Sequence, residues 1–183
     1  MLIGMATQYT AIGDPHREFI AAQPVFFVAT AAPDGHVNLS PKGMDSLRVL
    51  SPNRVIWLNV TGSGNETAAH LLEHPRMTLM FCAFEGKPLI LRLYGTARAV
   101  HSRDADWLEL KAQLPDIIGA RQIFDLNVEL VQTSCGMAVP LMDFRAHRDD
   151  LNRSVAGKDL DEYRRRKNLV SIDGKPTGLL EDV

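Results

Sequence analysis

Two short segments of the sequence combine the residue types that bind phosphate groups. The first is 39–43 (LSPKG), and the second is 61–67 (TGSGNET), which leads into a predicted helix. At the start of a helix, unpaired backbone N–H groups and the positive end of the helix dipole meet at one point, where an anion is stabilised. Lys42 would add a full positive charge and Ser40 a hydrogen-bond donor. Together the two segments indicate a phosphate-binding site.

A structural interpretation of the same residues stays open. Gly62 and Gly64 are typical of a tight turn, Asn65 of a helix cap, and Lys42 of a solvated surface. Neither segment is specific when it is taken alone. The histidines and cysteines have no metal-ligand spacing, so we expect no metal site.

The composition indicates an ordinary globular chain. It has 183 residues, of which 45% are hydrophobic and 23% charged, and we expect a single domain over 1–183. The net charge of -2 argues against a nucleic-acid partner. Residues 1–11 lack the pattern of a signal peptide, no apolar run is long enough to span a membrane, and Cys82 and Cys135 cannot form a disulfide framework. We therefore expect a cytoplasmic protein with no membrane association.

The elements that would position these segments are mainly β-strands. Alternating and β-branched patterns, separated by turn residues, predict about seven strands with short helices between them. Gly95 lies inside a long strand and indicates a bulge or a bend. This order predicts a mainly β (α+β) fold, an antiparallel barrel with short peripheral helices and a polar, helical C-terminal tail from about residue 145. The expected strands are 25–31, 36–40, 46–50, 54–60, 76–84, 88–101 and 123–135. The expected helices are 65–73, 102–114, 158–168 and an earlier one with Asp14 as its N-cap that Pro24 ends.

The order of these segments resembles one known family. In pyridoxamine 5'-phosphate oxidase-like, FMN-binding split barrels, a strand ending in lysine and glycine precedes an aromatic strand, a phosphate loop, a short helix ending in Pro-Arg and an apolar strand. Residues 37–95 contain these parts in that order: 42–43 (KG), 56–59 (IWLN), 63–67 (SGNET), 74–76 (HPR) and 77–84. With SPKG upstream of GSGNET and CGMAVP downstream at 135–140, the chain is similar to an uncharacterised branch of that family.

The resemblance implies a split barrel, FMN as the cofactor, and a homodimer whose two FMN molecules lie at the subunit interface. Residues 37–41 would lie beside the flavin ring, and Lys42 would contact the phosphate or the ring edge. Asn65, Glu66 and Thr67 fall where the oxidases have a serine and two basic residues that hold the phosphate. The cofactor-binding residues implied in this way are Val37, Asn38, Leu39, Ser40, Pro41, Lys42, Leu58, Asn59, Ser63, Asn65, Glu66 and Thr67, with Leu58 and Asn59 acting through backbone groups.

The sequence departs from the oxidases in two places. Glu66 puts a carboxylate where they have positive charge, so we expect it to turn back and cap its helix, with Arg76, Arg92 or Arg98 supplying the missing charge. In addition, nothing after Leu141 resembles the oxidases' C-terminal substrate-recognition segment. The resemblance therefore implies an FMN-dependent oxidoreductase of unknown substrate rather than a pyridoxamine phosphate oxidase.

The catalytic residues cannot be named from the sequence, because a flavin carries out hydride transfer itself. A non-catalytic flavin-binding or stress protein is one alternative, and a haem or deazaflavin binder on the same barrel is another. The short phosphate loop suits FMN better than the longer tail of a deazaflavin, and no histidine is placed as a haem ligand.

Overall fold

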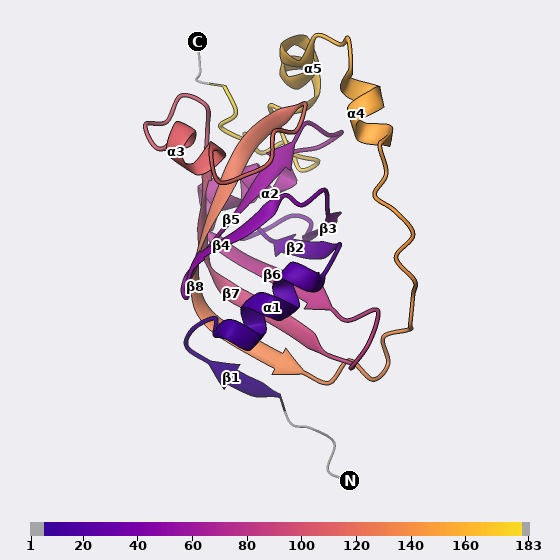
Figure 1. The fold of residues 1–183 in the computed structure, drawn as a ribbon. Helices are drawn as coiled ribbons and strands as arrows, with labels where there is room; N and C mark the ends of the chain where they lie inside the picture. Colours follow the sequence, from indigo (N-terminus) through magenta and orange to yellow (C-terminus); the bar gives the residue numbers. More distant parts are fainter. Residues whose placement is uncertain (1–5, 181–183) are drawn as a thin grey trace.

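The computed structural model describes residues 6–180, which form one antiparallel sheet of eight strands with short helices around it (Figure 1). The strand order is β3-β2-β6-β7-β8-β5-β4, and β1 pairs with β8 outside this path. The expectations for residues 1–5 and 181–183 lie outside the described residues. The strands are β1 (Thr7–Tyr9), β2 (Phe26–Thr30), β3 (Asn38–Lys42), β4 (Leu47–Ser51), β5 (Arg54–Val60), β6 (Arg76–Cys82), β7 (Ile90–Val100) and β8 (Ala120–Ser134), and the helices are α1 (Asp14–Ala22), α2 (Glu66–Glu73), α3 (Trp107–Lys111), α4 (Asp150–Val155) and α5 (Leu160–Lys167).

The core explains why β5 is a continuous apolar run. Val55 and Trp57 face the main core, where Trp57 packs on Phe124 with ring centroids 4.6 Å apart. Ile56 and Leu58 point the other way, into a second apolar cluster that includes residues of α3 and β8. Because both faces of β5 are buried, its sequence lacks the alternation of a half-exposed strand. Strand β5 ends at Val60, directly before the predicted phosphate loop.

The predicted bulge at Gly95 is confirmed. The register of β7 on β8 shifts between Tyr94 and Gly95, and a Cβ on Gly95 would lie 1.9 Å from the carbonyl oxygen of Asn127. No side chain fits there, so glycine is required by the close approach of the two backbones. The bulge bends the longest pair of strands in the sheet, as curling into a barrel requires.

The structure corrects several boundaries. The helix expected over 102–114 covers only Trp107–Lys111, because the Asp104 carboxylate accepts a hydrogen bond from the His101 N–H and holds the preceding residues in turns. Strand β8 begins at Ala120, earlier than expected. The sequence analysis missed β1 and α4, which are only 3 and 6 residues long and have weak periodicity.

The chain after β8 contains the helices α4 and α5 and a segment that packs back on the sheet domain. Residues 135–149 run along one side of the molecule from the end of β8 to α4 (Figure 1), and α5 and the residues after it return to α2. Within 6–180, no helix has both the length and the apolar character needed to cross a bilayer.

Candidate phosphate-binding site

A cavity of about 530 Å³ lies between β3, the end of β5 and the start of α2. The structure brings most of the residues implied by the resemblance together around it. Lys42 and Thr67, which belong to the two different phosphate segments, both line this cavity. The residues from the sequence prediction that line it are Val37, Asn38, Leu39, Ser40, Lys42, Asn59, Ser63, Asn65, Glu66 and Thr67.

Two implied residues lie elsewhere. Pro41 is exposed, like Leu39 on the same face of β3, but it lies nearer the end of the strand and lines a separate hollow with Met44 and Leu151. The Leu58 side chain is buried in the second apolar cluster. Its backbone N–H is already bonded to the carbonyl oxygen of Ser46 at 2.8 Å and has no free capacity for a ligand.

Lys42 enters the cavity from the end of β3. Its ammonium group lies 5.4 Å from the centroid of the Trp57 ring, a cation–π arrangement in which the aromatic face favours the charge. Burial lowers the pKa of Lys42 to about 8, and the nearby positive charge of Arg121 lowers it further in the same direction. The site thus contains a cation that is short of compensating negative charge.

Arg121 is the functional candidate that the sequence analysis missed. It is the second residue of β8, and it is 6% exposed. One guanidinium nitrogen, Nη2, donates to the carbonyl oxygen of Gly64 at 3.1 Å, while Nε and Nη1 have no hydrogen-bond partner within residues 6–180. Burial lowers the pKa of Arg121 to about 10, and the charge of Arg164 adds to this. A buried arginine with two unpaired donors is therefore a candidate contact for an anionic group.

One signal for Arg121 was present in the sequence. An arginine that opens an apolar strand (RQIF, 121–124) is unusual, because arginine is rarely buried without a partner. The three arginines proposed earlier lie elsewhere, so that part of the prediction was wrong. Arg76 is exposed and bonds His74, Arg92 bonds Ser134, and Arg98 pairs with Asp106 and Asp125.

The start of α2 forms another wall of the cavity. Asn65 is the N-cap residue of α2, as the structural interpretation expected, but its side chain makes no capping hydrogen bond. Its Oδ1 accepts from Asn59 at 3.4 Å, and its Nδ2, in a side chain 2% exposed, has no partner among the described residues. Asn38 donates to Thr67 Oγ1 at 3.2 Å and links β3 to the first turn of the helix. The N–H groups of that turn have no intrahelical acceptor.

Glu66 avoids Lys42 and Arg121 in a way that was not expected. Its carboxylate does not cap its own helix; Oε2 accepts a hydrogen bond from the backbone N–H of Ile172 at 2.9 Å. No ion pair joins Glu66 to Lys42 or Arg121 in the part of the chain that the structure describes. The two cations therefore keep their charge available inside the cavity.

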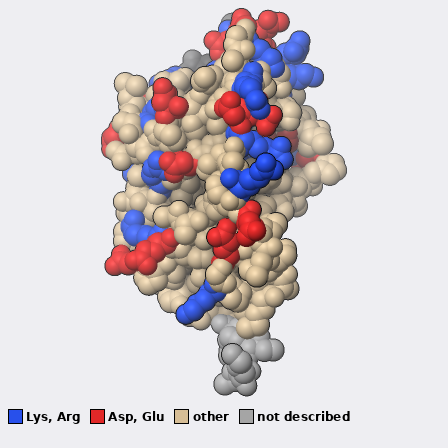
Figure 2. Space-filling view, turned by 45° about the vertical axis from the view of Figure 1, so that its right-hand side comes forward, with Lys and Arg blue, Asp and Glu red and all other residues tan. Residues whose placement is uncertain are grey.

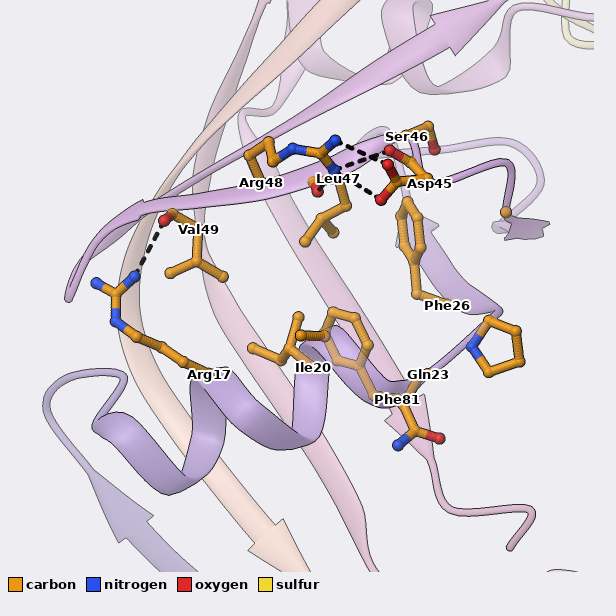
Figure 3. A pocket seen from close by; sticks show the side chains of 13 residues that line it. Arg17, Ile20, Gln23, Phe26, Asp45, Ser46, Leu47, Arg48, Val49 and Phe81 are labelled. Atoms are coloured by element: carbon orange, nitrogen blue, oxygen red, sulfur yellow. Dashed lines mark hydrogen bonds and ion pairs between the residues drawn. The ribbon is translucent and has the colours of Figure 1, made fainter. Parts of the chain in front are cut away.

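A second hollow, of about 290 Å³, lies between α1 and β4 and has a different character (Figure 3). Its wall is largely apolar, with Ile20, Phe26 and Phe81 pointing into it. Its charged groups are bonded within the protein: Arg17 donates to the carbonyl oxygen of Val49 at 3.0 Å, and Arg48 pairs with Asp45 at 2.8 Å. Since these cations have partners, this hollow is not a candidate anion site.

The face of the molecule in Figure 2 does not share the cationic character of the cavity. On the face in Figure 2, acidic and basic side chains are interspersed among uncharged residues, in keeping with the net charge of -2. The positive charge of Lys42 and Arg121 is therefore local to the cavity and does not extend over this face.

The fold and the cavity together define an antiparallel split barrel with a pocket whose donors suit a phosphate group. A family model described as pyridoxamine 5'-phosphate oxidase matches residues 12–135. The chain belongs to the pyridoxamine 5'-phosphate oxidase family. A relative from Aspergillus flavus, the pyridoxamine 5'-phosphate oxidase family protein ustO, is 36% identical over 189 residues, covering 92% of this chain and 76% of the relative.

Solved structures share the fold at low sequence identity. HupZ of Group A Streptococcus superposes with a TM-score of 0.51 at 20% identity, covering 65% of this chain and 91% of its own. A candidate pyridoxamine 5'-phosphate oxidase from Lactobacillus delbrueckii gives 0.53 at 21%, covering 67% and 94%. HutZ, the haem storage protein from Vibrio cholerae, gives 0.50 at 18%, covering 69% and 97%. These matches confirm the predicted split barrel.

Proposed function

We propose that this protein is a cytoplasmic flavoprotein that binds FMN and acts as an oxidoreductase, with the FMN phosphate between Lys42 and Arg121. The observation that carries the proposal is the pair of cations in one cavity, one of which has two donors without partners. A phosphate monoester carries nearly two negative charges at neutral pH and three acceptor oxygens, so it would compensate both cations. The donor set thus fits the tail of FMN.

The chain's own residues would bind and orient the cofactor. The first-turn N–H groups of α2 and the Thr67 hydroxyl would bond the phosphate next to the two cations. Val37 and Leu39 have side chains 73% and 63% exposed at the cavity, and would provide an apolar surface for the flavin ring. Bound FMN would supply hydride transfer, so that the protein needs no acid or base of its own for this step.

A homodimer is part of the proposal. β3 is an edge strand of the sheet, and it carries the exposed Leu39 next to the exposed Val37. A second copy packed on this edge would cover both side chains and enclose the cavity. Light scattering after gel filtration measures the mass directly. A monomer at micromolar concentration would contradict this part of the proposal.

The cytoplasmic location is supported by the cysteines. Cys82 and Cys135 are both free thiols in the structure, as expected of a protein from a reducing compartment. Fractionation of cells expressing the chain with a small tag would test this, and accumulation outside the cytoplasm would contradict it.

The absorption spectrum and the mass of the released cofactor test the proposed function. We expect a flavin spectrum and the mass of FMN after denaturation. A haem spectrum would support the haem-binding alternative, and a deazaflavin mass would support the other. If FMN is bound but no nicotinamide or small-molecule donor reduces it, the non-catalytic alternative is favoured instead.

A further inference from the structure

The segment after α5 contacts both walls of the cavity. We call residues 168–177 the C-terminal strap. Asn168 donates from its side chain to the carbonyl oxygen of Gly62 at 3.0 Å, on the phosphate loop, and the Ile172 N–H donates to Glu66 at 2.9 Å, on α2. On the opposite wall, Asp173 accepts from the His36 ring at 2.6 Å. The strap therefore bridges the phosphate loop, the helix and the turn before β3.

The strap has its own internal order. Asn168 is fully buried, and its carbonyl oxygen accepts a hydrogen bond from the Thr177 hydroxyl at 2.7 Å. Lys175 pairs with Glu73 at 2.8 Å and with Asp34 at 2.7 Å, which again connects α2 to the turn before β3. These contacts hold Ile172 at the mouth of the cavity, where its side chain is 75% exposed and lines the opening.

Glu66 is the acidic group most able to compete with a bound phosphate. It is the first residue of α2, and it lines the same cavity as Lys42 and Arg121. An unrestrained carboxylate at this position would be attracted to both cations and would occupy the donors that a phosphate needs. The hydrogen bond from the Ile172 N–H instead directs it toward the strap.

We propose that the C-terminal strap is a functional part of the anion site, in which the Ile172 amide positions the Glu66 carboxylate away from Lys42 and Arg121. This inference rests on the proposed phosphate site. It makes Glu66 and Ile172 positioning residues, and it gives the chain's C-terminal region a role in cofactor affinity. The arrangement explains how a carboxylate is tolerated next to a phosphate group.

The test separates the charge of Glu66 from its restraint. Glu66→Asp keeps the charge but shortens the side chain, so that it no longer reaches the Ile172 amide. Ile172→Pro removes the N–H while leaving Glu66 intact, and Ile172→Ala, which keeps the N–H, accounts for the loss of the side chain. We expect FMN binding, measured by fluorescence titration, to weaken about tenfold in Glu66→Asp and Ile172→Pro, and less in Ile172→Ala.

Removal of the charge should reverse the effect. Glu66→Gln should tighten FMN binding by about threefold in the otherwise wild-type chain. In the Ile172→Pro background it should tighten binding by about tenfold, because there the unrestrained Glu66 carboxylate, which competes with the phosphate, is replaced by a neutral amide. Glu73→Gln is the matched control, since it removes a carboxylate that contacts the same strap outside the cavity. It should not rescue Ile172→Pro. Equal tightening by Glu66→Gln in both backgrounds would overturn the proposal, as would unchanged binding in Glu66→Asp.

A second readout keeps this inference distinct from the proposed function. Inorganic phosphate at constant ionic strength should raise the melting temperature of the wild-type chain. The rise should be smaller in Glu66→Asp. In the double variant with Glu66→Gln and Ile172→Pro, the rise should return to at least the wild-type size. If FMN does not bind the wild type but this phosphate pattern is observed, the flavin proposal fails and the role of the strap stands. If FMN binds, but Glu66→Gln changes FMN affinity and the phosphate-dependent melting temperature by the same amount with and without Ile172→Pro, the role of the strap is refuted and the flavin proposal stands.

Discussion

Replacement of Arg121 by methionine should have opposite effects on cofactor affinity and on the stability of the cofactor-free protein. Methionine is unbranched and apolar, so it fills much of the same volume without the charge. In the structure, Arg121 Nε and Nη1 have no partners among the described residues, which leaves two donors for a ligand. Each charge-assisted hydrogen bond to phosphate contributes about 1.5–3 kcal/mol, so the loss of both should cost about 3 kcal/mol or more, roughly a 100-fold weaker Kd.

In the cofactor-free protein, the buried charge of Arg121 lowers the stability of the fold. Burial lowers the pKa of Arg121 to about 10, which corresponds to about 3 kcal/mol of destabilisation of the buried charge. Methionine removes that cost but leaves the Gly64 carbonyl oxygen without its donor, which offsets about 1 kcal/mol. We therefore expect the cofactor-free variant to be more stable than wild type by about 1–3 kcal/mol, as for other buried charges replaced by apolar side chains.

Two titrations test this pair of effects. Flavin fluorescence gives the Kd for FMN, and urea unfolding of the cofactor-free protein gives the free energy of unfolding. Arg76→Met is the matched control, because Arg76 is exposed and bonds only His74 among the described partners, and it should change neither quantity. If Arg121→Met binds FMN within threefold of wild type, or if it is less stable without cofactor, the assignment of Arg121 is refuted.

Three further outcomes follow from the same structure. The pKa of Lys42 is about 8, so this side chain loses its proton as pH rises from 7 to 9; FMN should bind more weakly over that range, and Lys42→Met should bind weakly with that pH dependence removed. A pH-independent wild-type Kd would contradict this. Thr67→Val removes the acceptor of the Asn38 amide and should weaken FMN binding by about fivefold while the protein stays folded by circular dichroism; unchanged cofactor occupancy would place the phosphate elsewhere. Gly95→Ala forces a methyl group to within 1.9 Å of the Asn127 carbonyl oxygen and should lower the free energy of unfolding by about 3 kcal/mol, measured in urea, and unaltered stability would argue against the bulge.

The predictable parts of the fold were those with strong local signals. Strand β5 has a continuous apolar run, and the β7 bulge has an interior glycine, so both could be read from neighbouring residues. Strand β1 could not, because its three residues are exposed and it pairs with β8, more than 110 residues further along the chain. Short elements of this kind depend on tertiary partners and have little intrinsic preference.

The same distinction holds within the cavity. Lys42 and the loop before α2 lie in recognisable short motifs, so their meeting was predictable from the family resemblance. Arg121 joins them from β8, 57 residues beyond Gly64, and only the register of β5 on β8 brings it there. The strap was hidden for another reason: its contacts are single hydrogen bonds and ion pairs made by a polar segment without periodicity.

The most direct test of the central claim is a crystal structure of the protein with FMN. We expect the phosphate oxygens to lie within hydrogen-bond distance of both the Arg121 guanidinium and the first-turn N–H groups of α2, with the Lys42 ammonium group beside them. FMN bound elsewhere on the barrel, or a phosphate that contacts neither cation, would contradict the account.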